Sequence, residues 1–243
     1  PRVAILSTGN EVVLPGVELG RGQLYSSNNH SLVGLVLETG CVPLDMGIAK
    51  DNIEELTAVL GRCLVADVVL TTGGVSVGAY DFVKEAFAAL GAEMAFWKVR
   101  LKPGKPLALG KVVQGGRTTL LFGLPGNPVS CMVNYLEFVR PWLLRSMGVK
   151  NPFLPIVSAV SEDDIAQRPG RWKALRVTLT EKDGEYYCRS TGTQSSGVLT
   201  SMVQAHGLML VEPDVSLVRA GQRVQVQLLR SSFLNRGDLG FGE

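Results

Sequence analysis

Residues 72–81 have the composition of a loop that binds anions. Four small residues in it have the backbone freedom or the hydroxyl group to contact a ligand: Gly73, Gly74, Ser76 and Gly78. Glycines let backbone amides approach a ligand closely, and the amino end of the helix predicted at 82–90 adds partial positive charge. The alternative is an ordinary glycine turn in which Asp81 caps that helix. The loop is neither a Walker loop nor a Gly-x-Gly-x-x-Gly fingerprint, so its own sequence does not distinguish an anion-binding loop from a capped glycine turn. The neighbouring motifs are needed to choose between these explanations.

Residues 123–130 form a second candidate loop, between a predicted strand and a long apolar helix. Its polar or conformationally restricted residues are Pro125, Gly126, Asn127, Pro128 and Ser130. Asn127 suits the N-cap and Pro128 the first helical position, so that the next residues present free amides. Capping does not explain Pro125 and Gly126, which stiffen and shape the loop ahead of the cap. A functional and a structural role are therefore equally open.

Lysines mark a third loop, at 102–106. Lys102 and Lys105 lie on a turn flanked by prolines, one of them Pro106, and Lys98 precedes Lys102 by four residues. Isolated surface lysines usually serve solubility alone. Two ammonium groups on a stiff loop that faces the amino ends of helices would instead bind a small oxyanion as point charges.

Three carboxylates follow predicted strands: Glu11, Asp51 and Asp81. Because ligands of open α/β sheets bind outside the carboxyl ends of the strands, these acids can converge at one edge. Mg²⁺ binds one or two carboxylates and takes phosphate oxygens from its substrate, so the cluster suits magnesium. Singly, each acid has an ordinary explanation, since Asp51 with Glu54 makes a fair capping box and Glu11 can be a solvated loop acid. Three acids at equivalent positions shift the balance toward a site.

The elements that must position these loops alternate between short apolar runs and longer amphipathic segments, the pattern of βαβ units. The predicted strands are 3–6, 43–48, 67–71, 93–99 and 119–123, and the predicted helices are 27–38, 52–64, 82–90 and 128–147. The expected fold class is α/β, a three-layer domain with a mostly parallel sheet over residues 1–148.

A second domain is predicted at 149–231. Its alternating runs lie at 174–180, 186–190, 208–211 and 223–228. Asp183 and Gly184 between two such runs are a strong hairpin signal. We expect a small all-β domain, a barrel or a sandwich, and a flexible tail at 232–243.

Composition excludes several classes of protein. A chain of 243 residues is long enough for two modest domains. The formal net charge of +2 argues against a nucleic-acid partner. No apolar run approaches the ~20 residues that span a bilayer, and the first residues indicate a strand rather than a signal peptide, so we expect a soluble cytoplasmic protein without membrane contact. The scattered cysteines favour reduced, mostly buried thiols over zinc ligands. They are Cys41, Cys63, Cys131 and Cys188.

The motifs together resemble those of the MoeA family, which includes the gephyrin E domain. The resemblance rests on the order and spacing of 7–11, 72–81, 102–106 and 123–130, and it continues through 192–196 and Ser201 with Met202. It implies a molybdopterin molybdotransferase, a magnesium-dependent enzyme of molybdenum cofactor biosynthesis that converts adenylylated molybdopterin and molybdate into the cofactor and releases AMP.

The resemblance also implies roles for residues. The family's magnesium carboxylates correspond to Glu11, Asp51 and Asp81. Its molybdate-binding groups correspond to Lys102, Lys105, Pro106 and Ser130. The other substrate-binding positions are Thr8, Gly73, Gly74, Ser76, Gly78, Pro125, Gly126, Asn127 and Pro128. In the β domain the corresponding groups are Ser195 or Ser196 and either Arg171 or Arg176.

This activity fits the scarcity of histidine. His30 and His206 are the only histidines, and no Ser-His-Asp or Cys-His arrangement is apparent. The dithiolene sulfurs of the substrate take the metal, so the protein needs no nucleophile. It has to position two anions and offset their repulsion.

Two departures from the family matter. The family normally has two further domains ahead of this region, so we expect a piece of a longer protein. Its site is completed across a homodimer, and the resemblance therefore implies activity for that dimer rather than for this piece alone. The second departure is Ser26, where the family often has Asp, which weakens one polar contact.

Two other functions compete. A molybdopterin adenylyltransferase shares the α/β fold, but it normally has neither a loop like 123–130 nor a following β domain. A gephyrin-like scaffold uses the same pair of domains to bind a receptor peptide, and an exposed apolar groove near the β domain would favour it.

Overall fold

A computed structural model describes residues 1–74 and 82–230 of the chain. They form two compact units, Pro1–Val99 with Pro103–Phe153, and Arg100–Lys102 with the chain from Leu154 on. The predictions for Ser76, Gly78, Asp81 and a tail at 232–243 concern residues outside these ranges.

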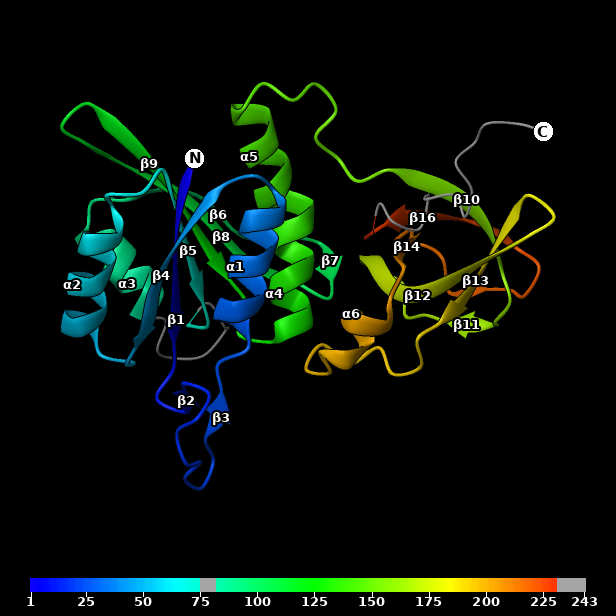
Figure 1. Cartoon of the computed structure of the whole chain (residues 1–243), viewed down its shortest axis with the longest axis horizontal. Coiled ribbons are helices and arrows are strands. Elements are labelled where there is room, and N and C mark those ends of the chain that lie inside the picture. Colours follow the sequence, from blue (N-terminus) through cyan, green and yellow to red (C-terminus); the bar gives the residue numbers. More distant parts are fainter. Residues whose placement is uncertain (75–81, 231–243) are drawn as a thin grey trace, which may run out of the picture. The chain divides into compact units, whose positions relative to one another are not determined.

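The first unit is built on a mixed sheet of six strands in the order β4-β1-β5-β9-β8-β6. The strands are β1 (Arg2–Thr8), β4 (Val42–Ala49), β5 (Val68–Thr72), β6 (Glu93–Lys98), β8 (Pro106–Gln114) and β9 (Arg117–Leu124). The four strands β4, β1, β5 and β9 are parallel, whereas β8 pairs antiparallel with both β9 and β6. Two short parallel strands, β2 (Val12–Val13) and β3 (Leu24–Tyr25), project beyond the end of β1 (Figure 1).

Helices cover both faces of this sheet and make three layers. The helices α1 (Asn28–Glu38) and α4 (Pro128–Asn134) lie over one face, and α2 (Ile53–Cys63) and α3 (Phe82–Ala89) lie over the other (Figure 1). A π-helical turn, η1 (Tyr135–Val139), connects α4 to α5 (Arg140–Ser146). The face toward α2 and α3 is a continuous core in which Leu6, Leu56 and Phe87 are all buried.

The second unit is a small closed barrel. Its strands are β7 (Leu101–Lys102), β10 (Ile156–Ser161), β12 (Trp172–Lys182), β13 (Glu185–Ser190), β14 (Gly207–Val211) and β16 (Arg223–Leu228). They follow the order β13-β10-β16-β14-β12-β7, and a pairing between β13 and β12 closes the barrel. Two short strands, β11 (Ile165–Ala166) and β15 (Leu217–Val218), and the short helix α6 (Thr200–Gln204) complete the unit.

The predicted fold class is confirmed, with corrections in detail. Asp183 and Gly184 form the expected hairpin turn, with φ values of 52° and 75°. The strands β8 and β10 were not predicted, and β8 makes the sheet mixed. Proline at its start and Gly110 within it mask the strand signal of β8, because both residues are uncommon in strand interiors. The long predicted helix at 128–147 is interrupted by η1.

Two further expectations concern burial and apolar length. All four cysteines are buried and free of disulfides, as predicted. Within residues 1–74 and 82–230, no helix has the length and apolar character needed to cross a bilayer.

Asn52→Ala should lower the free energy of unfolding by about 1 kcal/mol. Asn52 is the N-cap of α2, and its Oδ1 accepts hydrogen bonds from the amides of Glu54 and Glu55 at 3.0 Å each. Denaturant unfolding measures the change. Asp51→Ala is the matched control and should have the smaller effect, because Asp51 does not cap the helix. Equal losses in the two variants would contradict the assignment of the cap.

Candidate functional site

A buried polar cluster lies where β1 and β5 end. Ser7 Oγ is 2.5 Å from Asn29 Oδ1 and 2.9 Å from Thr72 Oγ1. Asn29 Nδ2 donates to Asp45 Oδ1 at 2.7 Å and to Gly47 O at 3.0 Å, which fixes the orientation of the amide. Ser7 must therefore donate to Asn29, and the Thr72 hydroxyl must donate to Ser7. This directed chain holds the last residue of β5 against the start of α1.

The loops after β1, β5 and β9 meet next to this cluster. The Gly73 amide donates to Leu124 O at 3.1 Å, and a Cβ on Gly126 would lie 3.5 Å from Gly73 Cα. A Cβ on Gly73, whose φ is +91°, would lie 2.7 Å from Thr8 O. Backbone from three strand ends therefore packs at distances that only glycine permits at residue 73. The structure thus brings together Thr8, Gly73 and Gly126 as the sequence predicts.

Neighbouring residues complete this edge of the sheet. Gly74 also has a positive φ, and a Cβ on it would lie 2.6 Å from Val83 Cγ2. Asn28 Nδ2 at the start of α1 donates to Gly126 O at 2.8 Å. Ser26 is 3% exposed, and its hydroxyl has no hydrogen-bond partner in the described part of the chain. A buried serine therefore occupies the position at which the family often has Asp.

The start of α4 differs from the prediction in one respect. Asn127 is the N-cap and Pro128 the first helical residue, but the Asn127 side chain makes no capping hydrogen bond. Its backbone carbonyl accepts from the Cys131 amide at 2.9 Å, so helix formation here relies on the backbone and on proline. Pro125 and Ser130 are buried, whereas Gly126 and Asn127 are exposed. The exposed Asn127 side chain is thus not engaged in capping.

The structure places two of the three predicted magnesium ligands. Glu11 is exposed, and its carboxylate lies against Gly9, where an added Cβ would be 2.9 Å from Oε1. Asp51 Oδ2 accepts a long hydrogen bond of 3.4 Å from the Asn10 amide. The capping-box explanation of Asp51 is wrong, because Asn52 caps α2.

The third acid, Asp81, lies outside the described residues. Within residues 1–74 and 82–230, no three His, Cys, Asp or Glu side chains gather as a metal site.

The lysine loop is divided between the units. Lys102 lies on β7 in the second unit, and Lys105 and Pro106 lie in the first. Asn134, fully buried on α4, donates from Nδ2 to Pro106 O at 2.9 Å. Gly104 has a φ of +114°, and a Cβ there would lie 2.2 Å from Asn134 Oδ1. Asn134 therefore shapes the loop that presents the exposed Lys105, a role with no local sequence signal.

Arg176 on β12 is a fully buried cation in the second unit. Its Nε donates to Ser201 Oγ and its Nη2 donates to Ser195 O, both at 3.2 Å. Nη1 has no hydrogen-bond partner among the described residues, and burial lowers the pKa of Arg176 to about 10. A guanidinium without a carboxylate partner is suited to an anionic ligand. Of the two predicted arginines, Arg176 is the one whose guanidinium is fully buried with a donor that no described residue accepts.

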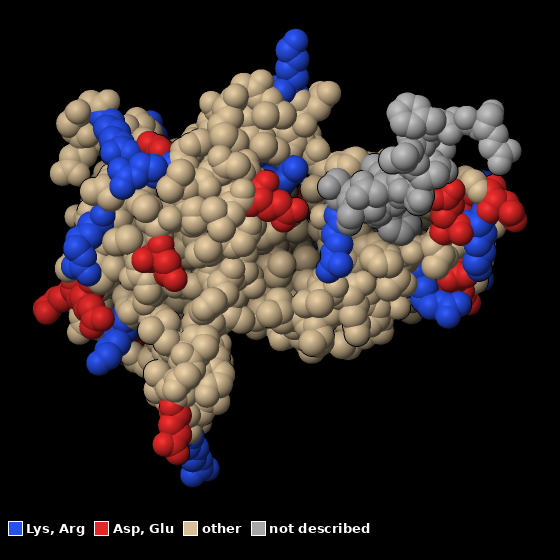
Figure 2. Space-filling model, in the orientation of Figure 1, with Lys and Arg blue, Asp and Glu red and all other residues tan. Residues whose placement is uncertain are grey.

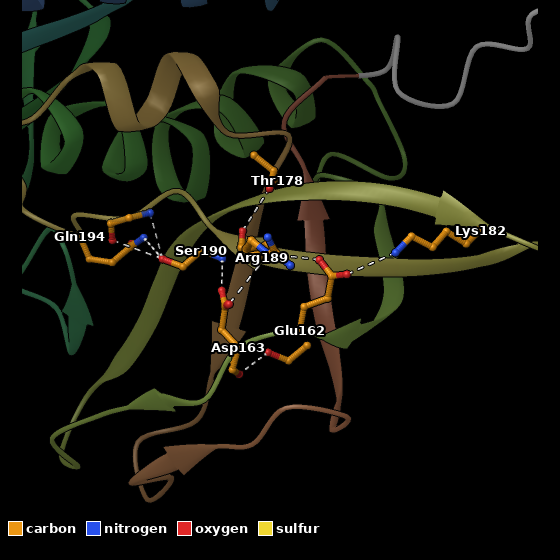
Figure 3. Close-up of polar contacts among 9 residues, drawn as sticks. Glu162, Asp163, Thr178, Lys182, Arg189, Ser190 and Gln194 are labelled. Carbon is orange, nitrogen blue, oxygen red and sulfur yellow. Dashed lines mark hydrogen bonds and ion pairs between the residues drawn. The ribbon is translucent and has the colours of Figure 1, made fainter.

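The segment before Ser195 is held by further polar contacts. Asp163 Oδ2 accepts from the Ser190 amide at 2.7 Å, and Gln194 Nε2 donates to Ser190 Oγ at 3.2 Å (Figure 3). Gln194 also makes two hydrogen bonds to the backbone of Arg176. Gln194 Oε1 accepts from the Arg176 amide and Gln194 Nε2 donates to the Arg176 carbonyl, both at 3.0 Å. Ser201 was not predicted as a contact, although it lies in the segment that carries the resemblance.

Charged side chains are mixed in sign on the face of the described residues that Figure 2 presents. On the face that Figure 2 presents, acidic and basic groups are interspersed in each unit. This face therefore presents no single sign of charge that would attract an anion over a long distance.

An α/β domain whose strand-end loops meet at glycines is typical of proteins that bind small ligands outside the carboxyl ends of the strands. The chain belongs to the family described as "Probable molybdopterin binding domain", whose model matches residues 4–145. A second model, "MoeA C-terminal region (domain IV)", matches residues 158–229.

Individual relatives agree with this assignment. The chain is 36% identical to molybdopterin molybdenumtransferase 2 of Mycobacterium tuberculosis over 93% of this chain and 56% of the relative. It is 34% identical to the molybdopterin molybdenumtransferase of Nostoc sp. over 93% of this chain and 52% of the relative. A crystal structure of the molybdopterin biosynthesis moea protein from Pyrococcus horikosii superposes with a TM-score of 0.79 at 32% identity, covering 95% of this chain and 55% of that one. The chain spans about half the length of the curated relatives it matches.

Gly73→Ala should lower the free energy of unfolding by more than about 1 kcal/mol, because the methyl group would meet Thr8 O at 2.7 Å in a left-handed conformation. Gly126→Ala is the matched control in the same cluster. Its Cβ would make an ordinary contact of 3.5 Å, so we expect a change within about 0.5 kcal/mol. Thermal and denaturant unfolding compare the two. A tolerated Gly73→Ala would mean that the loops do not pack as described.

Proposed function

We propose that the intact protein that carries this chain is a molybdopterin molybdotransferase, which inserts molybdate into adenylylated molybdopterin and releases AMP. The observation that carries the proposal is the convergence of the loops after β1, β5 and β9, where Gly73 packs against Thr8 and Gly126. Relatives named as molybdopterin molybdenumtransferases that align over 93% of the chain support this substrate class.

The glycine loops suit the phosphate-bearing substrate. Backbone amides that are not used within a helix or strand bind phosphate oxygens well, and the absence of a side chain at Gly73 and Gly74 allows close approach. The buried chain from Asn29 through Ser7 to Thr72 keeps this backbone in place before any ligand arrives. Such preorganisation reduces the free energy lost when a ligand orders its site.

Magnesium fits the donors that the described residues offer. Glu11 is exposed, and among the described residues the Asp51 carboxylate accepts only a long hydrogen bond of 3.4 Å, from the Asn10 amide to Oδ2. Both provide the hard carboxylate oxygens that Mg²⁺ prefers. We propose that Glu11, Asp51 and Asp81 hold the ion, which when bound offsets the negative charge of the substrate phosphates.

The oxyanion substrate requires cations. We propose that Lys102 and Lys105 bind molybdate, with Pro106 and Ser130 as further contacts, and that Arg176 with Ser201 is an anion contact of the second unit. Lys105 is exposed on a loop that Asn134 shapes, and Arg176 Nη1 has no hydrogen-bond partner among the described residues. Cationic groups of this kind offset the repulsion between two anionic substrates, and no protein nucleophile is required. The intact protein is proposed to act as a homodimer.

In the intact protein, Lys105→Ala and Asp81→Asn should each lower molybdate-dependent AMP release by at least about tenfold. Lys111→Ala is the matched lysine control, because Lys111 is exposed in the same unit and pairs with Glu93 at 3.0 Å. It should retain full turnover. The site assignment is wrong if both Lys105→Ala and Asp81→Asn keep the activity of the unmodified protein.

Arg176→Lys should raise the KM for molybdate by about tenfold or more. The lysine keeps a positive charge but loses the planar donors that reach Ser195 O and Ser201 Oγ. The same assay of AMP release measures KM, and thermal unfolding is followed in parallel. A lower melting temperature with an unchanged KM would give Arg176 a purely structural role.

A further inference from the structure

Asn134 connects two of the proposed molybdate contacts within the first unit. It is the last residue of α4 and is fully buried. Ser130 lies four residues earlier, so the two side chains leave the same side of the helix about one turn apart. Asn134 Nδ2 donates to Pro106 O at 2.9 Å. One side chain thus joins the helix that carries Ser130 to the loop that carries Lys105.

The orientation of the Asn134 amide follows from its surroundings. Exchanging its oxygen and nitrogen would place two acceptors, Oδ1 and Pro106 O, against each other, so Nδ2 is the donor. Oδ1 then faces Gly104, where an added Cβ would collide with it, and it has no hydrogen-bond partner among the described residues. A buried acceptor without a partner lowers stability. Costs of this kind are expected at functional positions.

The contacts of Asn134 hold the backbone on both sides of Lys105. Nδ2 binds the carbonyl of the residue after Lys105, and Oδ1 lies against Gly104, the residue before it. The Lys105 carbonyl itself accepts from the Val99 amide at 2.9 Å. Gly104 is buried, whereas Lys105 is exposed. The loop backbone is therefore fixed, and the Lys105 side chain can reach a ligand.

The helix that carries Ser130 is anchored separately from this loop. Tyr135, the first residue of η1, is fully buried, and its hydroxyl lies 2.8 Å from Thr39 Oγ1 and 3.1 Å from Leu35 O. Ser130 is 5% exposed. Packing around Tyr135 fixes the helix, and Asn134 then fixes the Lys105 loop relative to it. A π-helical turn directly after Asn134 agrees with a functional position, since such turns are frequent at functional sites.

We propose that Asn134 is a positioning residue that sets the separation between Ser130 and Lys105 and thereby makes the site selective for molybdate over smaller oxyanions such as sulfate. The inference rests on the proposed function, in which both residues contact molybdate. Molybdate and sulfate are both tetrahedral dianions, so charge alone does not distinguish them. A hydroxyl and an ammonium group held at a fixed spacing can do so, because the spacing suits only one size of ion.

Asn134→Val removes the donor to Pro106 O. In the intact protein it should raise the KM for molybdate by about tenfold or more while kcat changes less than about threefold, because binding geometry is lost rather than chemistry. The KM for adenylylated molybdopterin should stay the same. The inhibition constant of sulfate should change less than about threefold, so that the preference for molybdate falls. Molybdate-dependent AMP release measures all four quantities.

Asn134→Asp tests the donor directly. A protonated carboxyl group has the shape of the amide and can donate to Pro106 O, whereas an ionised one would place negative charge against that carbonyl. Burial raises the pKa of a carboxyl group, so the neutral form persists to higher pH than in water. The KM of this variant for molybdate should be close to that of the unmodified protein at low pH and should rise above it as pH increases. Asn134→Val should show no such rescue.

Asn151→Asp is the matched control, because Asn151 is exposed in the same unit. Its KM for molybdate and its inhibition by sulfate should equal those of the unmodified protein at every pH. Hydrogen exchange follows the loop without any activity. The Val99 amide should exchange at least about fivefold faster in Asn134→Val, whereas the amide of Leu6, in the buried strand β1, should be unaffected.

The proposal is overturned if Asn134→Val keeps both the KM for molybdate and the preference over sulfate. It is also overturned if the variant loses stability or kcat at an unchanged KM, which would make Asn134 purely structural, or if the KM of Asn134→Asp does not depend on pH. Asn134→Asp at low pH serves in place of Asn134→Val should the latter not fold.

Failure of the proposed function is distinguishable from failure of this inference. If the unmodified intact protein releases no AMP in response to molybdate, the proposed function is wrong. Calorimetric titration with molybdate and with sulfate then decides the role of Asn134. A lower preference for molybdate in Asn134→Val, with faster exchange of the Val99 amide, would support that role, and an unchanged preference would overturn it.

Discussion

The parallel pairing of β1 with β5, and of β5 with β9, fixes where the loops of the candidate site begin. Ser7 pairs with Thr72, and Thr72 pairs with Leu124, so the three strands end level with one another. The following loops start side by side, which is why the Gly73 amide can donate to Leu124 O. A slip of one residue in any of these strands would turn its side chains to the opposite face and separate the loops.

Hydrogen bonds at the strand ends make this register specific. Ser7, Asn29 and Thr72 are nearly or fully excluded from water, where an unpaired polar group is costly. Each of them finds its partner only when β1, β5 and α1 are in place. The glycines then contribute in a different way, because they remove side chains where backbones must pass closely. The polar cluster orders the edge of the sheet, and the glycines leave room on it for a ligand.

Sequence patterns predicted the loops better than the contacts within them. Gly73 and Pro128 each predict a backbone conformation directly. Glycine allows a positive φ at residue 73, and proline fixes φ at residue 128 to a helical value. The helix cap at Asn52 rather than Asp51 depends on where α2 begins, and such boundaries shift by a residue or two. The roles of Asn134 and of β7 could not be predicted, because they depend on contacts between segments far apart in the chain. Local composition carries no information about such partners.

The barrel illustrates how one strand can present two buried cations without conflict. Alternation along β12 directs Lys173 to the core face and Arg176 to the opposite face, so each has its own surroundings. Among the described residues, Arg176 donates to Ser201 Oγ and to a backbone carbonyl, and Lys173 donates to one backbone carbonyl. Neither arrangement lowers the free energy of the folded chain as much as an apolar residue would. The barrel has a closed apolar core formed by residues such as Val177, Met209 and Val226. Burial of this core stabilises the fold and offsets the free-energy cost of the two buried cations. The barrel therefore tolerates, on each face of one strand, a buried cation that has no carboxylate partner among the described residues.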